Sequence, residues 1–136
     1  MKNPQKYVGD VENIVLRSSW EKKFIIWADT TPQVLKISSE ELAIPYFSEV
    51  DLKTHRYFPD FLMMVQNNSG ELKRYMVEIK PESQTLPPKK RSRNTKSYLT
   101  ELATFSVNTS KWAAAEAWCK KNNMEFIIMT EKHLLT

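Results

Sequence analysis

The stretch from Tyr57 to Lys80, YFPDFLMMVQNNSGELKRYMVEIK, constrains the fold of this 136-residue chain more than any other. Two segments rich in aromatic, aliphatic and methionine residues, 58–66 and 72–80, flank the sequence NNSG at 67–70. Asn and Gly tolerate the positive φ angles that hairpin loops require. The pattern therefore predicts two antiparallel strands joined by a tight turn.

The turn also predicts the register of this hairpin. If Asn68, Ser69 and Gly70 form a three-residue loop, residues at equal distances along the chain from Ser69 face each other. Asp60 then lies opposite Glu78, with their Cβ atoms roughly 4.5–5.5 Å apart. Lys80 projects from the same face as Glu78, because side chains alternate along a strand.

Two facing carboxylates repel each other, and a divalent cation between Asp60 and Glu78 would neutralise them with the oxygen ligands that Mg²⁺ prefers. Lys80 beside such an ion is suited to hold an attacking water or to stabilise charge on a phosphate. The chain contains three Glu-x-Lys triplets, but only Glu78-Ile79-Lys80 ends an apolar strand opposite a Pro-Asp pair. The alternative interpretation is an edge hairpin with solvated surface charges.

The net charge of +4 is concentrated in one segment. The stretch 81–96 is rich in proline, and residues 85–100 contain no acid. This basic loop is predicted to contact the phosphate backbone of a nucleic acid. The alternatives are a solvated, flexible loop and a basic run of the kind found in localisation signals. Its five basic residues are Lys89, Lys90, Arg91, Arg93 and Lys96.

Composition favours one folded domain over residues 1–136, because 41% of the residues are hydrophobic and four are tryptophan. Cys119 is the only cysteine, which excludes an intrachain disulfide, and we expect it to pack in the core. The sequence predicts neither a signal peptide nor a membrane span.

The remaining elements follow from hydrophobic spacing and from capping and turn residues. Residues 1–17 are predicted to form an arm with one short ordered turn. Ser18 and Glu21 match a capping box for a helix that ends near Asp29. Further strands are expected at 33–39, at 42–50, where Pro45 indicates an edge strand or a bulge, and at 124–130 in a central position of the sheet. A polar turn is expected at 51–56, and helices are expected at 96–107 and 111–121 with a break or cap at 108–110.

The order is helix, three strands or so, helix, strand, which resembles the αβββαβ core of a restriction-endonuclease-like α/β fold, with a mixed central sheet flanked by helices. Together with Pro59-Asp60 and Glu78-Ile79-Lys80, it resembles the PD-(D/E)xK nuclease superfamily. The blocks RSSWEKKFIIWAD, RYFPDF, VEIKP, SKWAAAEAWCKK and EFIIMTEKHL are similar to the head-completion nuclease family of T-even-like tailed phages. They are similar, more distantly, to TnsA-type transposon endonucleases.

The resemblance implies a metal-dependent endonuclease that cleaves DNA with Mg²⁺, for which Mn²⁺ can substitute. Asp60, Glu78 and the backbone carbonyl of Ile79 would hold the catalytic ion, and Lys80 would position or activate the water. Glu21, on the first helix, would bind a second ion or orient a ligand water. It also implies action on packaged DNA ends in the host cytoplasm or in the virion, beside phage head or neck proteins.

Two other classes of function remain open from the residues alone. One is a non-catalytic, DNA-binding component of the virion, which would keep the fold and the basic loop without using the acids. The other is a structure-selective nuclease of the junction-resolving kind, which would share the site and act as an obligate dimer.

Overall fold

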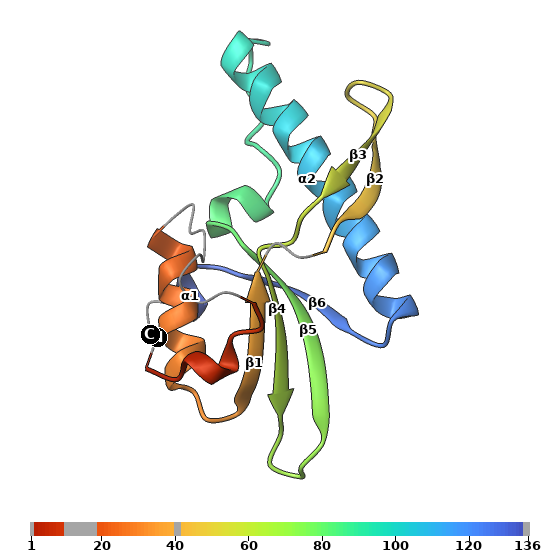
Figure 1. Cartoon of the computed structure of the whole chain (residues 1–136). Coiled ribbons are helices and arrows are strands. Elements are labelled where there is room, and N and C mark those ends of the chain that lie inside the picture. The colour runs from red at the N-terminus through yellow and green to blue at the C-terminus, as the bar shows by residue number, and fades with distance from the viewer. Residues whose placement is uncertain (1, 10–18, 40–41, 135–136) are drawn as a thin grey trace.

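The computed structural model describes residues 2–9, 19–39 and 42–134. A four-stranded sheet has the order β1-β4-β5-β6, in which β1 (Val34–Ser39), β4 (Phe61–Gln66) and β5 (Leu72–Ile79) are antiparallel. Strand β6 (Glu125–Met129) pairs in parallel with β5 (Figure 1). The mixed sheet and its helices confirm the predicted α/β, restriction-endonuclease-like fold class.

One helix covers each face of the sheet. Helix α1 (Ser19–Thr30) buries Phe24 and Ala28 against alternate residues of the strands, among them Phe61 and Val77. Helix α2 (Lys96–Lys121) packs the predicted core residue Cys119 on the opposite face, where Met76 is fully buried. Alternation along β5 therefore sends Met76 to the α2 face and Val77 to the α1 face.

The predicted hairpin register is confirmed. Phe61 faces Val77 and Gln66 faces Leu72, which are pairs equidistant from Ser69. Gly70 has a φ of 83°, the left-handed conformation that the loop requires. The prediction that β4 begins at residue 58 is wrong, because the ladder starts at Phe61. Pro59, which has no backbone N–H, lies where the chain crosses between two sheets.

A second, two-stranded sheet stands beside α2. Strands β2 (Ile44–Ser48) and β3 (Lys53–Tyr57) pair antiparallel, so the prediction of a polar turn over 51–56 is wrong. The side chains of β3 are polar because the hairpin projects beyond the main sheet, and within β3 only the last residue, Tyr57, is buried. Pro45 lies in β2, in agreement with the predicted edge strand.

Two further predictions are corrected. Helix α2 runs without a break through 108–110, where Asn108 is buried and the Thr109 hydroxyl hydrogen-bonds back to the Ser106 carbonyl at 2.9 Å. Strand β6 lies at the edge of the sheet, not in its centre. Its apolar sequence reflects two covered faces, since Ile127 packs in the α1 cluster and Phe126 in the α2 cluster.

The short segments also have defined places. Residues Pro4–Lys6 form the short 3-10 helix η1, and Glu82–Thr85 form η3 directly after β5. A last short helix, α3 (Glu131–Leu134), follows β6. The predicted cap Ser18 and most of the predicted arm lie outside the described residues. No helix of the described part is long and apolar enough to span a membrane.

Candidate active site

One pocket of about 480 Å³ lies where β4 begins and β5 ends. Glu21 from α1, Asp60 from the residue before β4, and Glu78 from β5 line it together with Lys80. These are the four residues predicted to carry catalysis. The structure brings all four to one cavity, although they come from three separate elements of the chain.

Asp60 is held in place by the neighbouring strand. Its Oδ2 accepts a hydrogen bond of 2.8 Å from the backbone N–H of Ile79, next to Glu78. The contact follows from the hairpin register, which continues beyond the last paired residues to set Asp60 against the end of β5. The charge of Asp60 therefore lies beside the carboxyl group of Glu78.

Glu78 is the deeply buried acid of this pair, with 5% of its surface exposed. The Tyr57 hydroxyl donates a hydrogen bond to its Oε2, and the Lys80 ammonium lies 3.8 Å from its Oε1. Burial, and then the charge of Asp60, raise the pKa of Glu78 to about 7, and Tyr57 and Lys80 offset only part of that rise. Near neutral pH the site therefore favours a species that balances negative charge, either a proton or a cation.

The donor set fits a magnesium ion bound largely through water. Within the described residues, no group of three or more His, Cys, Asp or Glu side chains forms a ready metal cage. Mg²⁺ is commonly bound by one or two carboxylates and keeps several waters. Asp60 and Glu78 supply two adjacent carboxylates at a cavity, so they meet that requirement, whereas Glu21 lines the same pocket without completing a three-ligand group.

Two residues that the sequence interpretation missed also belong to this site. Lys111, in the middle of α2, lines the pocket, with its Nζ 5.8 Å from the ring centroids of both Tyr46 and Tyr57. Its charge, like that of Lys80, lowers the pKa of Glu78. No motif marks Lys111, and the expected helix break at 108–110 concealed its position on a continuous helix.

Tyr57 is the second missed residue. Burial, reinforced by the charge of Glu78, keeps the pKa of Tyr57 well above its ordinary value, so its phenol remains a hydrogen-bond donor. The sequence signal was an aromatic residue just before the hairpin. An aromatic residue at that position does not by itself indicate a contact to Glu78.

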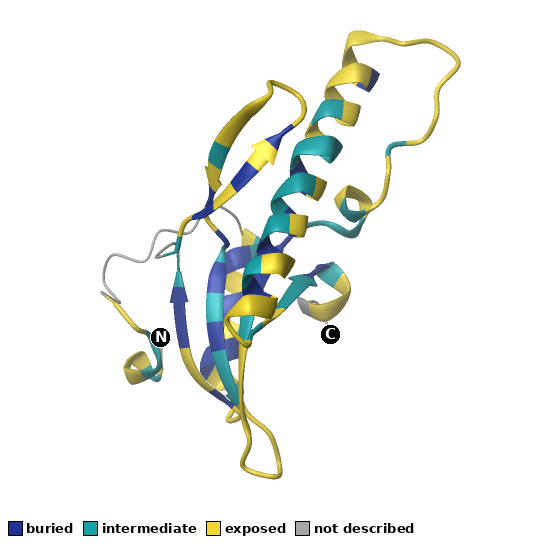
Figure 2. Cartoon of the chain, turned by 90° about the vertical axis from the view of Figure 1, so that its right-hand side faces the viewer, coloured by how far each residue is buried: buried dark blue, intermediate teal, exposed yellow. Residues whose placement is uncertain are grey.

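The five predicted DNA-binding residues lie away from this pocket. All are exposed, on the loop after η3 and at the first residue of α2 (Figure 2). Arg91 is already engaged, because its guanidinium lies 3.0 and 3.2 Å from the Glu101 carboxylate oxygens and 5.7 Å from the Tyr98 ring centroid. The basic loop thus forms a surface separate from the four-residue site.

Comparison with known proteins identifies the family. A family model described as "TnsA-like endonuclease N terminal" matches residues 31–131. The chain belongs to the TnsA-like endonuclease family. The matched segment of the chain contains Asp60, Glu78, Lys80 and Lys111, and Glu21 lies before it.

The chain is also similar to a head completion nuclease of Enterobacteria phage T4. The two are 41% identical over 137 aligned residues, which cover 98% of this chain and 89% of that protein. No solved structure matches the chain significantly. The predicted resemblance, and with it the assignment to a nuclease family, is confirmed.

Proposed function

We propose that the protein is a Mg²⁺-dependent DNA endonuclease that acts during phage head completion, on the ends of packaged DNA. One observation carries this proposal, the meeting of Asp60, Glu78 and Lys80 in a single pocket beside the end of β5. Membership of an endonuclease family and the likeness to a phage head completion nuclease support it. Mn²⁺ is expected to substitute for Mg²⁺.

Asp60 and Glu78 hold the ion in this proposal, with the backbone carbonyl of Ile79 as a further oxygen ligand. The ion, when bound, neutralises charge on the phosphate and lowers the pKa of a bound water. The hydrogen bond from Ile79 N–H to Asp60 orients one carboxylate, and the Tyr57 hydroxyl orients the other. Glu21, across the same pocket, binds a second ion or orients a ligand water.

Lys80 positions the attacking water. Its ammonium lies 3.8 Å from Glu78 Oε1 and its side chain is 30% exposed, so it reaches both the buried acid and the solvent. The water oxygen bonds to phosphorus while the bond from phosphorus to one deoxyribose oxygen breaks. The proton lost by the water neutralises that leaving oxygen.

The basic loop binds the DNA backbone without reading its sequence. Its side chains are exposed lysines and arginines, which recognise phosphates as charges. By analogy with the similar phage protein, we infer that the enzyme works in the infected host cytoplasm, beside head or neck proteins.

Cleavage of supercoiled and linear plasmid, in Mg²⁺ or Mn²⁺ and in EDTA, tests this function. The wild-type protein should cut only with metal, and Asp60→Ala and Glu78→Ala should each lower the rate by at least about a thousandfold, since each removes an ion ligand. Glu71→Ala is the matched control, because Glu71-Leu72-Lys73 repeats the Glu-x-Lys pattern on the same hairpin, at exposed positions. Undiminished cutting by Asp60→Ala would disprove the site assignment.

A further inference from the structure

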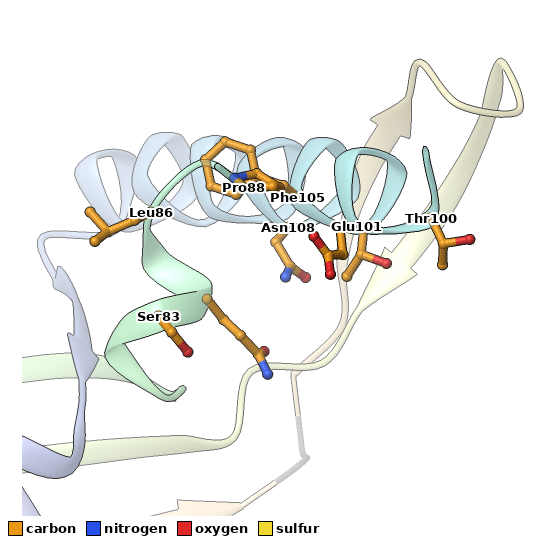
Figure 3. A pocket seen from close by; sticks show the side chains of 9 residues that line it. Ser83, Leu86, Pro88, Thr100, Glu101, Phe105 and Asn108 are labelled. Atoms are coloured by element: carbon orange, nitrogen blue, oxygen red, sulfur yellow. The ribbon is translucent and has the colours of Figure 1, made fainter. Parts of the chain in front are cut away.

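A second cavity adjoins the candidate active site. It has a volume of about 410 Å³ and lies between η3, the loop that follows it, and the N-terminal half of α2 (Figure 3). Gln84 lines this cavity as well as the pocket that holds Glu78. The volume falls within the range of roughly 300–1,000 Å³ that small-molecule sites occupy. A DNA strand that extends from the active site past Gln84 would therefore reach this cavity next.

The walls of the cavity combine apolar faces with an amide. Leu86, Pro88 and Phe105 supply the apolar part. Asn108 is only 7% exposed, and it lies in the wall of the cavity. Figure 3 shows its amide directed into the space between η3 and α2. An amide in a cavity wall offers both a donor and an acceptor to a bound group.

The charges around the cavity suit a nucleic-acid strand. Glu101, on its wall, is paired with Arg91, so its charge is offset. A shallow depression along α2 shares Asn108 with the cavity and extends from Lys96 to Lys111, which also lines the active-site pocket. Lys96 and Lys111 therefore lie at the two ends of this depression, about 22 Å apart along α2. That distance spans several nucleotides of a bound strand, whose phosphates both ammonium groups would attract.

We propose that this cavity binds one unpaired nucleobase of the DNA strand being cut, so that single-stranded tails and frayed ends are the preferred substrates. The inference rests on the proposed nuclease function and names its substrate class. A duplex keeps its bases stacked inside and presents sugars and phosphates, which would leave the apolar walls unused. An unpaired base brings apolar faces for Phe105 and a polar edge for Asn108.

DNA binding without metal tests the proposal. Fluorescence anisotropy in EDTA compares a short labelled single strand of mixed sequence with the duplex of the same length. The full-length protein should bind the single strand more tightly. Phe105→Ala should weaken that binding by about 5- to 160-fold, since stacking of a base on an aromatic ring contributes roughly 1–3 kcal/mol. Leu86→Ala, at a position 58% exposed and so harmless to the fold, should weaken it severalfold.

Leu102→Ala is the control, because Leu102 is an exposed leucine of α2 that lies outside the cavity. Equal wild-type affinity for both DNA forms, or losses in Phe105→Ala and Leu86→Ala no larger than in the control, would overturn the proposal. Metal plays no part in this assay. A protein that binds single strands as expected but cuts no DNA in Mg²⁺ would disprove the nuclease function and leave the base-binding cavity standing.

Discussion

At the scale of single residues, Glu78 is an ionisable residue in a buried position, where its negative charge is unfavourable. Burial is the main reason that its pKa rises to about 7 from an ordinary value of 4.5, and Asp60 adds to the rise. A protein gains nothing in stability from such an arrangement at neutral pH. An unfavourable carboxylate charge of this kind is expected of a cation-binding site without its ion, because a bound cation would stabilise the charged carboxylate.

The pH dependence of stability follows from this shift. The folded pKa lies above the unfolded one, so the favourable contribution is complete below about pH 4.5 and is lost as the pH rises through about 7. Relative to Glu78→Gln, the wild-type protein should lose about 3 kcal/mol of unfolding free energy between pH 4.5 and 8 in EDTA. Urea unfolding of both proteins across this range measures the difference. Parallel curves would show that Glu78 titrates normally.

At the scale of elements, helix α2 connects the basic loop to the candidate active site. It is one helix from Lys96 to Lys121, and it carries Asn108 and Lys111 on the side that faces the cavities. Had the chain broken at 108–110, as its Asn-Thr-Ser sequence suggested, nothing would fix Lys111 relative to Lys96. A rigid helix places both ammonium groups on one line.

A proline substitution tests the continuity of α2. Thr109 is exposed in the middle of the helix, so Thr109→Pro should cost about 3 kcal/mol or more by removing a backbone hydrogen bond and creating a clash. Thr109→Ala, the control, should leave stability unchanged or slightly higher, since Ala is the better helix former. Thermal unfolding followed by circular dichroism compares the two. Near-equal stability of the proline and alanine variants would indicate the break that the sequence suggested.

At the scale of the whole molecule, the basic loop lies apart from the acidic residues of the candidate active site. The exposed basic loop lies at the N-terminal end of α2, and the acids lie at the end of the sheet (Figure 1). The loop can therefore attract the DNA backbone at a distance from the negative site, and the cavities along α2 link the two. A mixture of the two charges in one place would instead weaken both the proposed phosphate contacts and the proposed metal site.

Salt titration of DNA binding tests the role of this loop. Neutralising a residue that contacts phosphate should reduce the slope of log affinity against log salt by about 0.9 for duplex DNA, whatever its sequence. Lys89→Ala and Arg93→Ala should behave in this way. Arg91→Ala should change the slope less, because Arg91 is already paired with Glu101. Lys73→Ala is the control, because Lys73 lies near the turn of the hairpin, at the end away from the candidate active site. A loss of affinity that depended on the DNA sequence would contradict binding to the backbone.

Local patterns determined the hairpin and much of the site. The turn at 67–70 and the two-residue period of a strand specify the register, because a slip by one residue would turn every core side chain outward. That register alone predicted the approach of Asp60 to the end of β5. The helix α1 and the strands β1 and β6 were likewise visible in hydrophobic spacing and in turn residues.

Only the tertiary structure decided what surrounds that pair of acids. The hydrogen bond from Tyr57, the approach of Lys111 and the cavity at Asn108 depend on how β3, α2 and η3 pack around the sheet. Polar residues in β3 and the Asn-Thr-Ser stretch in α2 carry weak local preferences, and tertiary contacts overrode them. Spacing along the chain records periodic burial within one element, whereas the distance between side chains on different elements is set by packing.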